Sequence, residues 1–184
     1  KQLSATNTFQ LAVNEVNQAP TLLVPANRTI HAGTTLSASA MATDPDMPAN
    51  PFSYSKLSGP AGVNVSAAGG ITWNTSDTDA NTTNVIVLRV NDNGVPNLSD
   101  TNSFVVTVGP QLRFTAITKT GSVATVVWSA IPDSGYRVQY KTNLDVTSWS
   151  DVIGDVIATG TTASKADATL GTNATRFYRV FALP

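Results

Sequence analysis

The sequence predicts an all-β protein built from two β-sandwiches in tandem. Short runs of alternating apolar and polar residues recur along the 184-residue chain, separated by clusters of Gly, Pro, Asn and Asp. No segment carries the i, i+3, i+4, i+7 apolar spacing of a helix over a useful length. The acidic residues comprise eleven Asp and a single Glu, and Asp favours turns whereas Glu favours helices.

An internal repeat indicates the domain boundaries. Residues 3–13 line up position for position with residues 98–108, an offset of 95 residues that matches one sandwich domain. We therefore expect residues 1–19 to be the last strand of a preceding copy, within residues 4–13, followed by its linker. Pro20 disfavours helix at Ala19, so the linker is expected to be extended. The first sandwich is predicted over residues 20–109 and the second over 110–184, with Gly109-Pro110 as the break.

Several strands follow from the same patterns. Residues 85–90 are apolar on both faces, which predicts a central strand, and residues 36–42 alternate as one half-buried strand. Trp73 and Trp128 stand in apolar strand patterns and are predicted core residues. His31, the single histidine, is predicted to lie on the surface of a strand.

Composition excludes several classes of function. The chain has no cysteine, a net charge of -1 and no apolar run near the ~20 residues that span a bilayer. We therefore expect no disulfide, no nucleic-acid partner and no membrane insertion. Asp44 with Asp46 cannot flank a glycosidic bond from opposite sides, since they are two residues apart in one loop. The chain is expected not to be an enzyme, and the missing initiator Met suggests a piece of a longer protein.

Three spaced motifs carry a family resemblance across residues 1–109. Residues 89–99 resemble the end signature of cadherin repeats, Asp44-Pro45-Asp46 resembles their Asp-x-Asp loop, and residues 15–20 resemble their linker. The linker and Gly70-Ile71-Thr72-Trp73 are similar to bacterial cadherin-like and Ig-like tandem repeats. The resemblance implies an Ig-like, Greek-key sandwich from a large secreted or cell-surface protein.

The second half resembles the fibronectin type III group and its relatives. The residues that carry this resemblance are Trp128, residues 136–140 and residues 177–180. The resemblance implies a second β-sandwich, of a kind that often closes long secreted bacterial proteins.

The cadherin resemblance also implies a Ca²⁺ site at the first junction. The matching residues are Glu15 and Asn17 in the linker, Asp44 and Asp46 in the loop, and Asp92 in the end signature. Calcium prefers six to eight oxygen ligands, and crowded carboxylates repel one another without a cation. The alternative is that these Asp residues only cap turns. No metal is expected at the second junction, because residues 108–111 hold no acid, and residues 77–79 are predicted to be a solvated loop.

The expected function is that of a non-catalytic spacer, with neighbouring domains of the same polypeptide as partners. Calcium at the first linker would stiffen it. The alternatives are a carbohydrate-binding accessory module of a polysaccharide-degrading enzyme and an adhesion module with a cell-surface ligand. Trp149, expected in a short strand between Ser148 and Ser150, is the candidate for stacking on a sugar ring.

Overall fold

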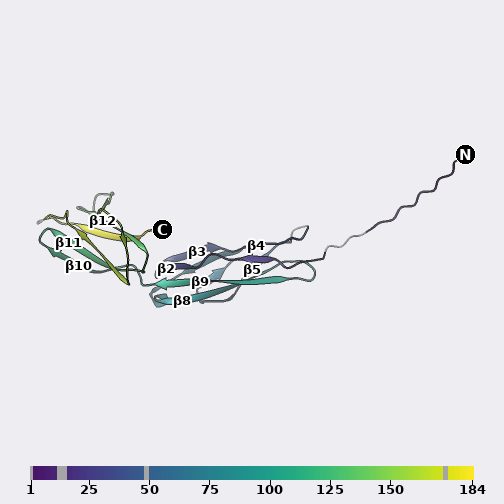
Figure 1. Cartoon of the computed structure of the whole chain (residues 1–184), viewed down its shortest axis with the longest axis horizontal. Coiled ribbons are helices and arrows are strands. Elements are labelled where there is room, and N and C mark those ends of the chain that lie inside the picture. The colour runs from purple at the N-terminus through teal and green to yellow at the C-terminus, as the bar shows by residue number, and fades with distance from the viewer. Residues whose placement is uncertain (1, 12–15, 48–49, 172–173) are drawn as a thin grey trace.

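The computed structural model describes residues 2–11, 16–47, 50–171 and 174–184. Within these ranges the chain forms sixteen strands and a single 3₁₀ turn, η1, at Asp77–Asp79. The all-β prediction is therefore confirmed. The strands gather into two groups that follow one another along the chain (Figure 1).

The first sandwich consists of strands β1 to β9. One sheet has the order β2-β9-β8-β5, in which β9 runs antiparallel to β8 and parallel to β2. A second sheet has the order β3-β7-β6, and β1 pairs separately with β4. The strands are β1 (Thr21–Leu23), β2 (Arg28–His31), β3 (Thr35–Ser39), β4 (Met41–Thr43), β5 (Ser53–Ser58), β6 (Val63–Val65), β7 (Gly70–Asn74), β8 (Thr82–Asn91) and β9 (Ser99–Gly109).

The core of the first sandwich lies between these sheets. Leu88 on β8 and Phe104 on β9 pack in one hydrophobic cluster with Leu36 on β3 and Trp73 on β7. The central position predicted for residues 85–90 is correct, because β8 lies between β9 and β5. Its second face is not in the core: Val85 is exposed, since each sheet of a sandwich has a single inner face.

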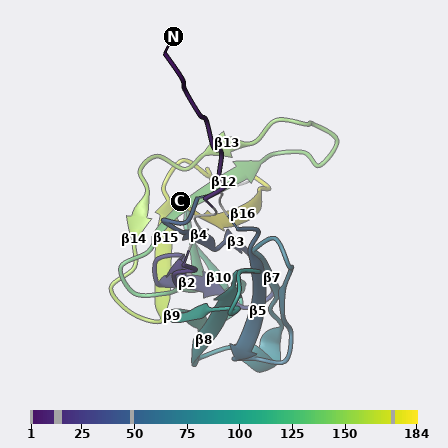
Figure 2. The ribbon, with the colours of Figure 1, turned by 90° about the vertical axis from the view of Figure 1, so that its right-hand side faces the viewer.

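The second sandwich consists of strands β10 to β16. One sheet has the order β10-β11-β15, and in the other β12 pairs with β16 on one side and with β13 and β14 on the other. Trp128 and Tyr136 are fully buried in its hydrophobic cluster. The strands are β10 (Phe114–Thr120), β11 (Val123–Ser129), β12 (Gly135–Lys141), β13 (Ser150–Asp151), β14 (Val156–Ile157), β15 (Thr162–Asp167) and β16 (Phe177–Ala182). Figure 2 shows this group from the end that carries the N-terminus, with the β12–β13 loop projecting from it.

Two predicted strands differ from the structure. Residues 36–42 are divided between β3 and β4, which pair with different strands. The division falls at the buried Ala40, whose N–H donates to Gly69 rather than to a ladder partner. No strand forms in residues 2–11 of the segment predicted as the last strand of a preceding copy, because no neighbouring strand lies beside them (Figure 1). The rest of that predicted strand, residues 12 and 13, lies outside the described residues.

The prediction for His31 was wrong. Its side chain is 7% exposed rather than on the surface. Its hydrogen-bond partners belong to Pro110 and Tyr136. The residues next to position 31 give no indication of contacts so distant in sequence.

Candidate functional site

Three segments meet at the end of the first sandwich where the linker enters. The side-chain amide of Asn17 donates to the Asp92 carboxylate (3.0 Å) and to the Pro96 carbonyl (2.8 Å). The next residue, Gln18, donates its backbone N–H to both carboxylate oxygens of Asp46, at 3.2 and 3.0 Å. The linker is thus bonded to the Asp46 loop and to the turn after β8. We call Asn17, Asp44, Asp46, Asn50 and Asp92 the junction cluster.

Asp92 organises the turn that follows β8. Its Oδ1 accepts the backbone N–H groups of Gly94 (3.1 Å) and Leu98 (2.9 Å), and its side chain is buried. Burial raises the pKa of Asp92, but the donors from Leu98, Asn17 and Gly94 outweigh that effect and hold the pKa below its ordinary value. A side chain at Gly94 would collide with Asn17, since a Cβ there would lie 1.8 Å from Asn17 Oδ1. Gly94 therefore allows the linker to approach the turn closely.

The Asp44–Asp46 loop completes the junction cluster. Asp44 Oδ1 accepts the backbone N–H of Asp46 at 2.9 Å, and Asp46 is itself buried. The Asn50 amide bridges the loop to the linker, with 2.8 Å to Asn17 Oδ1 and 3.4 Å to Asp46 Oδ2. The remaining oxygen, Asp44 Oδ2, is buried and has no hydrogen-bond partner.

The oxygens of the junction cluster are the kind that calcium binds. N–H groups already satisfy Asp46 and Asp92, as expected of residues that cap turns, whereas the buried Asp44 Oδ2 is left without a hydrogen-bond partner. Among the described residues no group of three or more His, Cys, Asp or Glu side chains is spaced to hold a metal ion. Glu15 lies outside the described residues. The structure brings Asn17, Asp44, Asp46 and Asp92 to one end of the sandwich.

The other acidic loop of the first sandwich is solvated, as predicted. Residues 77–79 form η1, where Ser76 and Asp79 make a capping box. Asp79 Oδ2 accepts the Ser76 backbone N–H at 2.8 Å. None of the residues of η1 is buried.

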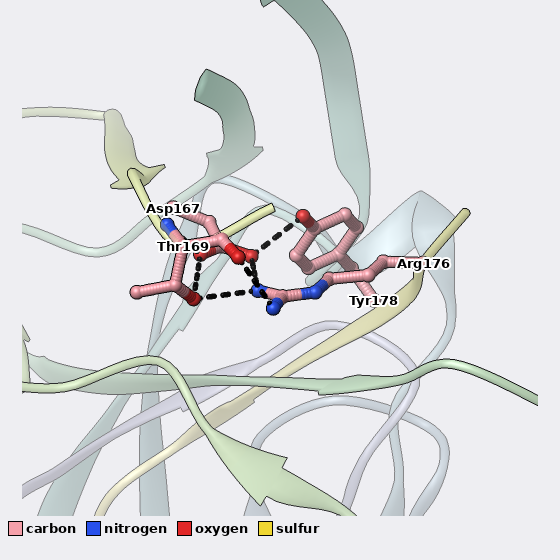
Figure 3. Close-up of polar contacts among 4 residues, drawn as sticks. All are labelled: Asp167, Thr169, Arg176 and Tyr178. Carbon is pink, nitrogen blue, oxygen red and sulfur yellow. Dashed lines mark hydrogen bonds and ion pairs between the residues drawn. The ribbon is translucent and has the colours of Figure 1, made fainter. Parts of the chain in front are cut away.

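A polar cluster in the second sandwich was missed at the sequence level. Asp167, at the end of β15, accepts hydrogen bonds from Thr169, from Arg176 and from the Tyr178 hydroxyl, the last at 2.8 Å (Figure 3). Arg176 also donates to the Thr169 carbonyl at 2.8 Å, and its guanidinium lies 3.7 Å from the centre of the Tyr140 ring. The cluster therefore ties both ends of the loop after β15 to the sheet.

The ion pair between Asp167 and Arg176 is buried. Only 9% of the Arg176 side chain and 3% of the Asp167 side chain are exposed. Desolvation raises the pKa of Asp167, but hydrogen bonds from Arg176, Thr169 and Tyr178 prevail and lower it. Desolvation together with the Asp167 charge raises the pKa of Tyr178 to about 12. A cavity of about 400 Å³ lies beside the pair, walled by Tyr140, Val152, Ile153, Asp167, Thr169 and Arg176 among others.

Trp149 is partly exposed and lies one residue before β13 rather than within a strand. Two cations lie over its ring: Lys141 Nζ at 4.8 Å and Arg179 Cζ at 4.4 Å from the ring centre. Arg179 is held in turn by its Nε, which donates to Gln139 Oε1 at 2.8 Å. The ring is thus engaged by cation–π contacts on the outer surface of the β12–β16 sheet.

Comparisons with known proteins find only distant structural similarity. No protein-family model matches the sequence, and no curated protein matches it significantly. The chicken CNTN1 FN1–FN3 domains align with TM-score 0.44 and 16% identity, covering 90% of this chain and 62% of that one. Mouse cadherin-23 EC22–24 aligns with TM-score 0.42 and 17% identity, covering 90% and 65%. A nucleoside hydrolase-related hypothetical protein from Saccharophagus degradans, associated with carbohydrate metabolism, aligns with TM-score 0.41 and 23% identity, covering 50% and 26%.

The strand arrangement, rather than these weak alignments, defines the class of protein. The chain has the cadherin- and Ig-like β-sandwich fold in its general form. It spans less than two thirds of the length of each of the three structures named above. Within the part of the chain that the structure describes, no helical segment could span a bilayer.

Proposed function

We propose that this chain is a non-catalytic spacer module of an extracellular protein, made of two domains over residues 20–109 and 110–184. The observation that carries this proposal is the bonding of the entering linker. Asn17 and Gln18 are hydrogen-bonded to Asp92 and Asp46, two buried carboxylates of the domain that follows. A linker held on two sides has a fixed direction, and a fixed direction is what a spacer contributes.

We propose further that Ca²⁺ stiffens this junction. Asp44, Asp46 and Asp92 would supply carboxylate oxygens, Asn17 a neutral oxygen, and Glu15 a further carboxylate from the linker. The support is the buried Asp44 Oδ2, which has no other partner. Bound calcium would offset the repulsion among these carboxylates and hold the linker and the loop in one arrangement.

The test is a calcium titration followed by thermal unfolding. With chelator first and then calcium up to about 1 mM, the range typical of extracellular modules, we expect the melting temperature to rise in the parent protein. Asp44→Asn keeps the shape of the side chain but should abolish most of the rise. Asp77→Asn, in the solvated η1 turn, is the matched control and should respond as the parent does. A melting temperature that ignores calcium would reject the metal site.

Trp149 favours carbohydrate binding as a second candidate function. Its ring is partly exposed on the outer surface of the β12–β16 sheet, where Lys141 and Arg179 also lie over it. A sugar ring could stack on such a surface. Electrophoresis in gels containing soluble polysaccharide would test this: retardation that Trp149→Ala removes supports sugar binding, and free migration in every gel opposes it.

A further inference from the structure

The two sandwiches are joined through the single histidine. His31 ends β2 of the first sandwich, and both of its ring nitrogens bond to the second half of the chain. Nδ1 lies 2.6 Å from the Pro110 carbonyl oxygen, and Nε2 lies 2.9 Å from the Tyr136 hydroxyl. Tyr136 is fully buried in the core of the second sandwich.

The hydrogen-bond chain assigns the protonation state of His31. The backbone N–H of Ile131 donates to the Tyr136 hydroxyl oxygen at 2.7 Å. The Pro110 carbonyl can only accept, so Nδ1 carries a proton; in the neutral ring Nε2 then carries none and accepts the Tyr136 O–H. The imidazole proton is on Nδ1, where the Pro110 carbonyl accepts it. Every group in this chain is satisfied only while His31 is neutral.

Close packing surrounds these hydrogen bonds. A Cβ at Gly109 would lie 2.4 Å from Ile131 Cγ1, so that Ile131 packs directly on the glycine backbone. The imidazole meets the Tyr136 ring edge-on, with 5.8 Å between the ring centres. Ala32 N–H also donates to the Gly109 carbonyl at 3.1 Å. A joint with this many short contacts has one preferred geometry.

We propose that His31, Pro110 and Tyr136 form an acid-sensitive joint that fixes the angle between the two sandwiches without a cation. Protonation places a second N–H on His31, opposite the Tyr136 oxygen that already accepts from Ile131. The Tyr136 hydroxyl proton then has no acceptor, and a buried donor without a partner is costly. The joint opens because separating the sandwiches lets water reach these groups.

No charged group compensates the imidazolium among the described contacts of His31. Tyr136 is the titratable group that faces the ring from β12, and Pro110 and Ile131 present a carbonyl and an N–H. Thr34 and Thr75 bond only to the His31 backbone carbonyl. No described salt bridge reaches this region. Among these described contacts, the positive charge meets only neutral groups.

The role of this joint in the whole protein rests on the proposed spacer function. The joint itself lies at the opposite end of the first sandwich from the junction cluster. The spacer would be stiffened by calcium at one junction and by a neutral histidine at the other. Calcium should leave the His31 joint unchanged, so the two proposals fail separately.

Residual dipolar couplings measured by NMR from about pH 7.5 to about pH 4.5, the range of histidine titration, test the joint. The ring signals of the single histidine report its protonation in the same samples. While His31 is neutral, we expect the residual dipolar couplings of both sandwiches to fit one alignment. Once His31 is protonated, we expect the couplings of one sandwich to be smaller by at least about twofold. His31→Gln and Tyr136→Phe, on opposite sides of the joint, should show the reduced coupling at every pH.

Two results would overturn the proposal. The first is a protonated His31 with unchanged relative alignment of the sandwiches. The second is a His31 that stays neutral throughout this pH range. The amide spectrum of each sandwich is the control for folding, because it should remain dispersed in both variants.

Discussion

The side-chain amide of Asn17 donates a 3.0 Å hydrogen bond to the carboxylate of Asp92, although 75 residues separate them in sequence. Asp92 directly follows β8, at the start of the turn that leads to β9. Asn17 belongs to the linker that enters the sandwich. An amide at position 17 offers a donor to Asp92 and an oxygen to a neighbouring group. Charge at this one position therefore distinguishes a calcium site from turn capping.

Asn17→Asp should separate these two interpretations. Without calcium, a carboxylate facing Asp92 loses the donor and adds repulsion, so the melting temperature should fall below that of the parent. With calcium, the added negative charge should strengthen binding and enlarge the calcium-induced rise in melting temperature. Differential scanning calorimetry with and without chelator measures both. A variant that is equally destabilised in the two conditions would favour turn capping alone.

The buried pair in the second sandwich leads to a prediction about stability. Asp167→Asn removes the charge opposite Arg176, and breaking a buried ion pair by removing one partner costs about 3 kcal/mol. We expect a loss of that order in the free energy of unfolding, measured by urea denaturation. Asp155→Asn is the control, because its pair with Arg137 is partly exposed and exposed ion pairs contribute little to stability. Equal losses in the two variants would contradict this account.

The same pair predicts a dependence on acid. The pKa of Asp167 in the folded chain lies below its ordinary value of 3.8. Its contribution is therefore fully present above the unfolded pKa and is lost as the pH falls through the lower, folded pKa. Thermal unfolding measured below about pH 4 should show a steep loss of stability in the parent and a shallower one in Asp167→Asn. Parallel curves would show that Asp167 makes no special contribution.

Local patterns were enough to predict the all-β class, several strands and the core tryptophans, but not the long-range polar contacts. Trp73 and Trp128 stand in apolar strand patterns, and both are buried. His31 was misplaced because its partners lie 79 and 105 residues away. Asp167 did leave a signal: it occupies an inward-facing position of β15, and an acid at such a position calls for a basic partner.

The meeting of Asn17, Asp46 and Asp92 followed from a family resemblance rather than from residue spacing. Spacing alone could not place a linker against two loops, since the segments are distant in sequence. The buried oxygen of Asp44 has no counterpart in the sequence pattern, because burial of a loop depends on how the linker packs on it.

Two glycines in positive-φ turns should respond differently to substitution. Gly69 has φ +87°, and a Cβ there would lie 2.6 Å from the Ala40 carbonyl oxygen. Gly121 has φ +61° and open space around it. Gly121→Ala should cost only the left-handed backbone penalty of about 1 kcal/mol, whereas Gly69→Ala adds a backbone collision and should cost clearly more. Urea denaturation measures both, and equal effects would mean that the Gly69 turn moves to accommodate the methyl group.

The exposed segment at the start of the chain gives the last prediction, through a matched pair of phenylalanines. Phe9 and Phe104 occupy equivalent positions of the internal repeat, but Phe9 is 90% exposed whereas Phe104 is 2% exposed in the core. Phe104→Ala should therefore lower the free energy of unfolding by about 3–5 kcal/mol, the usual cost of truncating a buried Phe. Phe9→Ala should change it by less than about 0.5 kcal/mol, as for an exposed position. Backbone amides of residues 2–11 should also exchange with solvent far faster than those of β9, because β9 is hydrogen-bonded on both sides. A destabilised Phe9→Ala, or slow exchange in residues 2–11, would show that this segment pairs with the described sheets in solution.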